Sequence, residues 1–283
     1  MAEEQEGSSK VILVSDLDWT MVNHHDPDHR DLRAFNEIWK TQFSTTGSTL
    51  IFSSGRSPVL YRELAEHVPL LQPDVLVCSV GTEILVDHMS KTDEAWESYL
   101  DGQGWDRNMV LSVVEACHVD GVQFTLQQET EQRPHKVSYK VHGDNAEHIQ
   151  KAIDGLRGAL DAKGIAANVI YSGSVDLDIL PQRASKGKAL AFLLEQLGVH
   201  TRDDKGEVQM SDKVDAVVVC GDSGNDIELF EVPHVHGCIV ANAHQELRQW
   251  YDAHGKENTN MFFASKDGPA GIVECLSHYK FMK

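Results

Sequence analysis

The chain has 283 residues, of which 41% are hydrophobic and 24% are charged, and its formal net charge at pH 7 is −19. This length predicts one large or two modest domains, and the hydrophobic content is sufficient for a packed core. The acidic balance argues against a general nucleic-acid surface or an anionic-membrane surface, because both would be repelled. It does not exclude a small anionic substrate, since cations and a metal ion inside a pocket can oppose the charge of the whole molecule.

The termini and cysteines predict a cytoplasmic protein. Residues 1–10 are acidic and polar, unlike a secretory signal or a basic transit peptide. No apolar run reaches the ~18 residues that a membrane span needs. The five cysteines are scattered and odd in number, and three of them (Cys78, Cys220 and Cys238) lie in apolar, strand-like runs. Buried free thiols are therefore favoured over a disulfide framework or a metal site.

Short apolar runs alternate with helical patterns through most of the chain. The runs cover residues 11–14, 49–52, 75–78, 217–220 and 237–240, and the helical patterns cover 31–41, 58–66, 187–197, 226–230 and 245–250. Continuous apolar runs are typical of strands that are covered on both faces. The alternation predicts an α/β fold with a doubly wound, Rossmann-like parallel sheet, in which ligands bind outside the carboxyl ends of the strands.

The middle of the chain has a different pattern. Strands of alternating polarity are predicted at 122–126, 136–141, 168–171 and 176–180, and helices at 106–118 and 145–163. Alternation indicates a sheet with one wet face, which is typical of antiparallel sheets. We therefore predict an inserted α+β domain over residues 88–181 and a core formed by residues 1–87 and 182–283. Residues 203–207 are expected to form an exposed loop.

The first predicted strand ends at two carboxylates, in the segment Asp16-Leu17-Asp18-Trp19-Thr20. Asp16 projects into the crevice at the strand end, so it is the candidate nucleophile that attacks phosphorus to give an aspartyl-phosphate. Asp18 is the candidate acid that protonates the leaving oxygen and then activates water. The alternative is an Asp-rich turn, which on its own would be the better interpretation, but three further segments favour the catalytic one.

The second and third segments supply groups that bind phosphate. Ser54 offers a hydroxyl to phosphate, and with Gly55 and Arg56 it offers backbone N–H groups at the start of a helix. Whether the hydroxyl of Ser53 or that of Ser54 contacts the phosphate depends on where the strand ends. The ammonium of Lys186 would neutralise Asp16 and the transferring phosphoryl group. A plain turn and a solvated lysine are the respective alternatives.

The fourth segment, Gly221-Asp222-Ser223-Gly224-Asn225-Asp226, follows an apolar run and predicts a magnesium site. Carboxylate oxygens suit Mg²⁺, which keeps several waters and takes few protein ligands. Asp222 is expected to be a direct ligand, together with Asp16 and the carbonyl of Asp18. Asn225 and Asp226 are expected to orient the direct ligands, or to contact the ion through water, and not to bind it directly. A helix N-cap run is the alternative, and it explains only one of the two acids.

Two other clusters are given structural interpretations. The tract His24-His25-Asp26-Pro27-Asp28-His29 fits no regular metal spacing, so a solvated loop is favoured over a transition-metal site. Trp39, Trp96, Trp105 and Trp250 are expected to be packing residues, whereas Trp19 lies within the catalytic loop and is a candidate to shape the pocket.

These segments resemble the haloacid dehalogenase superfamily, and the chain is more closely similar to the sucrose-phosphate phosphatase family. The closer match is carried by residues 16–22, 79–84, 131–138 and 220–226, and by 171–173 with 176–182, so it extends over nearly the whole chain from about Val11 to Phe281. Two departures are noted: Ser54 stands where Thr is common, and the chain ends near Lys283, whereas land-plant relatives carry an additional domain. A monomer is expected for that reason.

The resemblance implies a Mg²⁺-dependent hydrolase that releases sucrose and phosphate from sucrose 6-phosphate, the last step of sucrose synthesis. It also implies that the inserted domain is a mobile cap, with hinges near Asp87 and Pro181, and by position Glu83, Lys136 and Asp178 are candidate substrate contacts. Sucrose-phosphate synthase is the candidate partner. Two alternatives stay open: a phosphatase for another phosphorylated sugar or sugar-acid, and a non-catalytic sugar-phosphate-binding partner of a sucrose-synthesising enzyme.

Overall fold

A computed structural model describes residues 9–87, 89–102, 104–172 and 174–282. The N-terminal residues 1–8, residue 88 at the predicted domain boundary, and Gly173 lie outside the described residues, as do 103 and 283. Among the described residues, no helix combines the length and the apolar character that crossing a bilayer requires.

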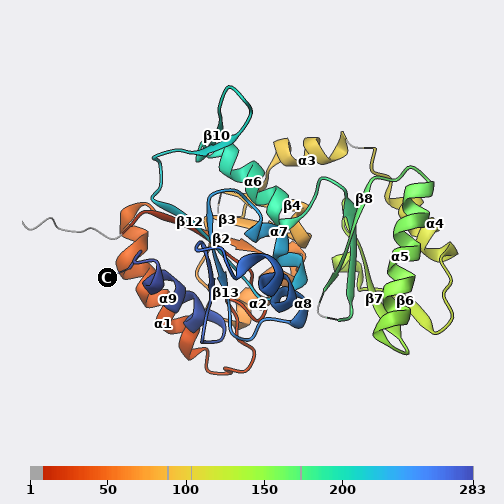
Figure 1. Ribbon diagram of the computed structural model, residues 1–283, viewed down its shortest axis with the longest axis horizontal. Coiled ribbons are helices and arrows are strands. Elements are labelled where there is room, and N and C mark those ends of the chain that lie inside the picture. The colour runs from red at the N-terminus through yellow and green to blue at the C-terminus, as the bar shows by residue number, and fades with distance from the viewer. Residues whose placement is uncertain (1–8, 88, 103, 173, 283) are drawn as a thin grey trace, which may run out of the picture.

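The larger sheet has eight strands in the order β14-β13-β12-β1-β2-β3-β4-β5 (Figure 1). The six strands from β14 to β3 are parallel, and β4 and β5 continue the sheet in antiparallel fashion. The bounds are β1 Val11–Ser15, β2 Thr49–Ser53, β3 Val75–Cys78, β4 Glu83–Val86, β5 Lys91–Thr92, β12 Ala216–Gly221, β13 Val235–Ile239 and β14 Met261–Phe263. The predicted doubly wound parallel core is therefore confirmed.

Both faces of this sheet are buried, which explains the continuous apolar runs. In β1, Ile12 and Val14 pack into one hydrophobic cluster, and Val11 and Leu13 pack into another on the opposite face. The first cluster includes residues of α3 Glu94–Asp101, α6 Lys186–Gln196, α7 Ile227–Phe230 and α8 Gln245–Trp250; the second includes residues of α1 Arg30–Ile38, α2 Pro58–His67 and α9 Gly268–His278. Cys78, Cys220, Cys238 and Cys275 are buried and Cys117 is partly exposed, and all five are free thiols, as predicted.

A second, antiparallel sheet forms the cap, with strand order β6-β7-β9-β8. Its strands are β6 Val122–Leu126, β7 Val137–Gly143, β8 Ala167–Ser172 and β9 Asp176–Pro181. The helices α4 Arg107–Ala116 and α5 Ala146–Ala162 cover the face that points away from the core, so the sheet lies between these helices and the core (Figure 1). The other face of the cap sheet is left to meet the core.

Two elements beyond residue 88 belong structurally to the core, which differs from the predicted cap range of 88–181. Strand β5 pairs with β4, and α3 buries Trp96 and Leu100 against the core. Trp96 also contacts Phe192 of α6 and donates from Nε1 to the carbonyl of Gly81. The division of the chain into two domains, with residues 88–181 as the cap, stays a prediction.

The remaining elements are short. The hairpin of β10 His200–Arg202 and β11 Val208–Met210 surrounds residues 203–207, all of which are exposed, as predicted. Trp39 and Trp96 are buried packing residues, as predicted.

Candidate active site

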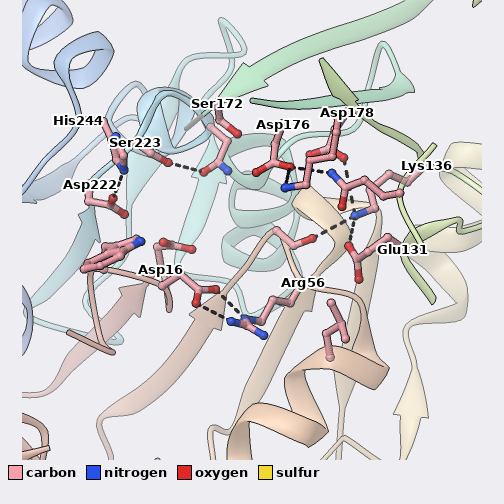
Figure 2. A pocket seen from close by; sticks show the side chains of 17 residues that line it. Asp16, Arg56, Glu131, Lys136, Ser172, Asp176, Asp178, Asp222, Ser223 and His244 are labelled. Carbon is pink, nitrogen blue, oxygen red and sulfur yellow. Dashed lines mark hydrogen bonds and ion pairs between the residues drawn. The ribbon is translucent and has the colours of Figure 1, made fainter. Parts of the chain in front are cut away.

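Asp16 and Asp222 lie side by side because the strands that precede them are parallel neighbours. Ser15, the last residue of β1, pairs in register with Cys220 of β12. Asp16 follows β1 directly, and Asp222 follows Gly221, the last residue of β12, at the same carboxyl edge. Ser54 follows β2 at the same edge. All four chemical segments therefore meet at this edge, and Figure 2 shows Asp16 and Asp222 at one end of the cavity and cap residues at the other.

Lys186 joins two of the carboxylates. It begins α6, is fully buried, and donates from Nζ to Asp16 Oδ1 and to Asp226 Oδ1, each at 2.7 Å. Burial on its own would lower the pKa of Lys186, but the adjacent Asp16 and Asp226 outweigh burial and raise it. The side chain is therefore a fixed positive charge beside the candidate nucleophile.

Three buried carboxylates, those of Asp16, Asp222 and Asp226, each have an oxygen within 4.8 Å of the others. Burial raises the pKa of Asp16 to about 7, and Asp226 and Asp18 add to the shift while Lys186 opposes it. Burial, together with the nearby Asp16 and Asp226, raises the pKa of Asp222 well above its usual range. Because one lysine does not compensate three buried acids, this donor set fits a divalent cation that prefers hard oxygen ligands.

Asp226 also shapes the loop on which Asp222 lies. Its Oδ2 accepts from the backbone N–H groups of Asp222 at 3.0 Å and Ser223 at 3.1 Å. Thr20 donates to Asp222 Oδ1 at 3.0 Å. The predicted outer role of Asp226 is compatible with these contacts, and the roles of Asp222, Asn225 and the Asp18 carbonyl at a metal stay predictions.

Asp18 is held by the side chains of Arg56 and His24. Arg56 donates to both of its carboxylate oxygens at 2.6 Å, and His24 Nε2 lies 2.8 Å from Oδ1. Burial alone would raise the pKa of Asp18, but the hydrogen bonds from Arg56 and His24 outweigh it and hold the pKa well below its usual range. In this arrangement Asp18 is ionised, so its predicted role as a proton donor requires that the Arg56 contact be released.

The loop after β2 differs in part from expectation. The N–H of Arg56 donates to Ser54 Oγ at 3.1 Å, so it is not directed at a phosphate site as predicted. Among the backbone N–H groups of residues 54–57, only that of Gly55 has no hydrogen-bond partner within the described part of the chain. Gly55 lines the cavity, so its N–H is the candidate phosphate donor, while the choice of Ser54 over Ser53 stays a prediction.

Residues of the core and of the cap line one cavity, which has a volume of about 420 Å³. Of the candidate substrate contacts, Lys136 and Asp178 line it, and so does Asn225. Glu83 is not among the lining residues, because its carboxylate is occupied by Arg133, which donates to both oxygens at 2.8 Å, and by Ser79 at 2.7 Å. Its prediction as a sugar contact therefore has no support from this arrangement.

Several lining residues were not predicted from the sequence. They are Leu60, Gln127, Glu131, Lys140, Ser172, Asp176, Ser223 and His244. Lys136, Ser138 and Lys140 alternate along the start of β7, and Asp176 and Asp178 alternate along β9, so a period of two places all five on one face. This alternation could have identified Lys140 and Asp176 as cavity residues from the sequence. In the structure the two side chains form an ion pair at 2.5 Å.

The histidine tract also has one contact that was not predicted. His24 is exposed, as expected for a solvated loop, yet it bonds to Asp18 and packs edge-on against Trp19 at a ring separation of 4.8 Å. Trp19 lines the cavity, as predicted for a residue that shapes the pocket.

Comparison with known proteins shows which family has this combination of core and cap. Residues 9–280 match the family model described as sucrose-6F-phosphate phosphohydrolase. The chain is 43% identical to sucrose-phosphatase 1 of Nicotiana tabacum over 96% of its own length and 60% of that protein, and 35% identical to a mannosylfructose-phosphate phosphatase of Agrobacterium fabrum over 95% and 96%. The chain thus spans about 60% of the length of the tobacco relative.

A solved structure of the sucrose-phosphatase of Synechocystis, in complex with sucrose and phosphate, superposes with a TM-score of 0.80 at 31% identity, covering 97% of this chain and 100% of that one. The fold is that of the haloacid dehalogenase superfamily, as the motifs implied. The chain belongs to the sucrose-6F-phosphate phosphohydrolase family.

Proposed function

We propose that this chain is a Mg²⁺-dependent phosphatase that hydrolyses sucrose 6-phosphate to sucrose and phosphate. The observation that carries the proposal is a buried carboxylate, Asp16, at the core end of a cavity whose cap end is lined by polar groups suited to sugar hydroxyls. Membership of the family and the likeness to the Synechocystis enzyme that binds sucrose and phosphate support the choice of substrate.

The proposed reaction has two steps. An oxygen of Asp16 attacks phosphorus and the bond from phosphorus to the sugar oxygen breaks. Asp18, which takes up a proton once Arg56 has released it, gives that proton to the sugar oxygen. Water then attacks the aspartyl-phosphate, Asp18 accepts its proton, and phosphate leaves. Lys186 stabilises the negative charge at Asp16 and the phosphoryl oxygens throughout, because its ammonium is fixed 2.7 Å from Asp16 Oδ1.

The residues that would hold Mg²⁺ are Asp16 and Asp222, with the carbonyl of Asp18, and with Asp226 and Asn225 in outer positions. When bound, the ion supplies positive charge that offsets the phosphoryl oxygens and the clustered acids. The three carboxylates fit such an ion because their mutual repulsion is otherwise only partly offset by Lys186.

We expect the stabilisation by Mg²⁺ to increase with pH. The pKa of Asp16 is raised to about 7 in the folded protein from an ordinary value of 3.8, so without metal this group stabilises the fold below pH ~4 and loses that contribution as pH rises through about 7. Ions bind the deprotonated carboxylate, so binding releases the proton. Melting temperatures with and without Mg²⁺ should differ more at pH 8 than at pH 5.5, and an equal or smaller difference at pH 8 would contradict this.

Replacing Asp18 by Asn should lower kcat on a sugar phosphate by about 10²–10⁴-fold, because the amide neither donates nor accepts the transferred proton. The matched control is Asp28→Asn, because Asp28 is an exposed acid of the following loop whose carboxylate pairs with Arg30 at 2.6 Å. Steady-state phosphate release measures both variants. A kcat for Asp18→Asn within a few-fold of the control would remove Asp18 from proton transfer.

The experiment that tests the proposed substrate is phosphate release from sucrose 6-phosphate beside fructose 6-phosphate, glucose 6-phosphate and trehalose 6-phosphate, each with Mg²⁺ or EDTA. A strong, Mg²⁺-dependent preference for sucrose 6-phosphate is expected. Equal rates on several sugars would keep the chemistry and remove the substrate assignment. No release from any of them by the folded, metal-loaded protein would favour the non-catalytic sugar-phosphate-binding alternative.

A second candidate substrate is mannosylfructose phosphate, because the Agrobacterium relative is 35% identical and matches this chain over nearly the full length of both. Adding that ester to the panel separates the two disaccharides. We also propose, as in the sequence-based interpretation, a cytoplasmic monomer with a cap that moves about connections near Asp87 and Pro181, and sucrose-phosphate synthase as the candidate partner.

A further inference from the structure

The cap reaches into the core at the loop that follows β2. This loop, residues 54–57, contains Gly55, which lines the cavity and whose N–H is the candidate phosphate donor, and Arg56, which holds Asp18. Its core side is fixed by backbone hydrogen bonds: Ser54 N–H donates to Val77 at 2.8 Å, and the carbonyl of Arg56 accepts from Ser79 at 2.9 Å. Its other side is fixed by residues of the cap.

Two cap residues, Glu131 and Lys136, hold that other side. Lys136 Nζ donates to the carbonyl of Gly55 at 3.1 Å, and Glu131 Oε1 accepts from the N–H of Ser57 at 2.9 Å. The two side chains also bond to each other, with 2.7 Å between Lys136 Nζ and Glu131 Oε2. The two side chains therefore bind backbone groups of the residues on either side of Arg56. Figure 2 shows Lys136 between Glu131 and Asp178, with Arg56 below them.

The ion pair is buried, with 1% exposure for Lys136 and 5% for Glu131. Burial alone would raise the pKa of Glu131, but Lys136 and Ser57 outweigh it and lower it. Buried ion pairs contribute little net stability compared with apolar side chains of similar size, because desolvation offsets their attraction. This pair binds two backbone groups of the proposed phosphate-binding loop. We therefore explain its presence by the loop conformation that it fixes, and not by its contribution to stability.

We propose that Glu131 and Lys136 are positioning residues for the phosphate-binding loop, so that the cap orients Gly55 and Arg56 even for a substrate that has no sugar. The continuous path runs from the cap ion pair through the backbone of residues 55–57 to Arg56, and from Arg56 to Asp18. This deepens the proposed function and rests on it for the identity of the phosphate site. A positioning role predicts that loss of these residues slows hydrolysis of phosphate esters that have no sugar, whereas a direct sugar contact predicts no such effect.

The test uses p-nitrophenyl phosphate with Mg²⁺, and competitive inhibition by inorganic phosphate. Glu131→Ala and Lys136→Met should each lower kcat/KM for p-nitrophenyl phosphate by about 10-fold or more, because a displacement of about 1 Å in a positioning loop has effects of up to about 10²-fold. Both variants should also weaken inhibition by phosphate. Glu131→Gln keeps an oxygen that accepts from Ser57, and Lys136→Arg keeps a cationic donor, so these conservative variants should lose less.

The matched control is Asp101→Asn. Asp101, at the end of α3, bonds to His135 Nε2 at 2.8 Å, so it also links the core to the segment 131–136, but it does not touch the loop at 54–57. It should leave hydrolysis of p-nitrophenyl phosphate unchanged. If Glu131→Ala or Lys136→Met lowers the melting temperature below the assay range, the double variant Glu131→Leu/Lys136→Met removes both buried charges and both backbone contacts together, and gives the same comparison.

Unchanged kcat/KM and phosphate inhibition in the folded variants, with only KM for a sugar phosphate raised, would overturn the proposal and make these residues sugar contacts. If the wild-type protein hydrolyses no phosphate ester, the proposed function fails, and the positioning role is then judged by phosphate-induced stabilisation. The positioning role is supported if phosphate and Mg²⁺ raise the melting temperature of wild type and Asp101→Asn but not that of Glu131→Ala or Lys136→Met. It is contradicted if the latter two variants show the same rise.

Discussion

Replacing Asp16 by Asn should abolish phosphoryl transfer, with a fall in kcat on the order of 10⁴-fold or more, as expected when a nucleophile is removed. The amide is nearly isosteric, so the buried position at the end of β1 remains filled. It also removes one negative charge beside Asp222 and Asp226, so the metal-free variant should be at least as stable as the wild type. Phosphate release under saturating substrate, together with thermal melting, measures both effects.

The control for this variant is Asp204→Asn, in the exposed loop of the β10–β11 hairpin. It makes the same chemical change at a residue that does not line the cavity, and it should retain wild-type kcat. If Asp16→Asn kept more than a few per cent of the kcat of this control, the covalent mechanism would have to be abandoned in favour of direct attack by water.

Replacing Lys186 by Met should be the most damaging single change to the site. The ammonium is fully buried and pairs with both Asp16 and Asp226. Its removal leaves these buried carboxylates uncompensated, which should lower the free energy of unfolding of the metal-free protein by about 3–5 kcal/mol. Activity should be lost as well, because the charge that stabilises the phosphoryl group is gone. Denaturant unfolding in EDTA gives the first effect and phosphate release gives the second.

Lys188→Met on the same helix is the matched control. The side chain of Lys188 is 43% exposed and lies 3.7 Å from Glu228, so the change should cost less than about 1 kcal/mol. Equal stability of the Lys186 and Lys188 variants in EDTA would show that the buried lysine does not compensate the acidic cluster.

The core strands and their catalytic ends could be predicted because each signal is local. A continuous apolar run that stops at a carboxylate identifies both the strand and the residue at its end, and parallel pairing then brings Asp16 and Asp222 together. The alternating strands of the cap could be predicted in the same way, and β6 has the predicted bounds of 122–126.

Other elements have weak local signals. The helix α9 begins with Gly268-Pro269-Ala270-Gly271, a composition typical of a turn, and its helical nature depends on burial of Ile272, Cys275 and Leu276 against the sheet. Strands β5 and β14 have two and three residues, so periodicity cannot identify them. The helix α3 lies in the range assigned to the cap, because nothing in its sequence indicates that Trp96 packs on α6.

Contacts between residues of separate segments could not be predicted, and they include the contacts that join cap and core. Arg56 reaches Asp18 over 38 positions, and Arg133 reaches Glu83 over 50. A charged residue in a loop gives no sign of its partner until the fold places the two together. For this reason Glu83 was predicted to contact the sugar, whereas the structure shows it bonded to Arg133 and Ser79.

The central claim is that the phosphoryl group is transferred to Asp16, and the most direct measurement is to locate the covalent intermediate. The protein is mixed with sucrose 6-phosphate and Mg²⁺, quenched in acid within milliseconds, reduced with borohydride, and digested for mass spectrometry. Reduction of an aspartyl-phosphate converts that aspartate to homoserine, so we expect this mass change at residue 16 and its absence in Asp16→Asn. Modification at Asp18 or Asp222 instead, or turnover with no modified aspartate at any quench time, would contradict the account.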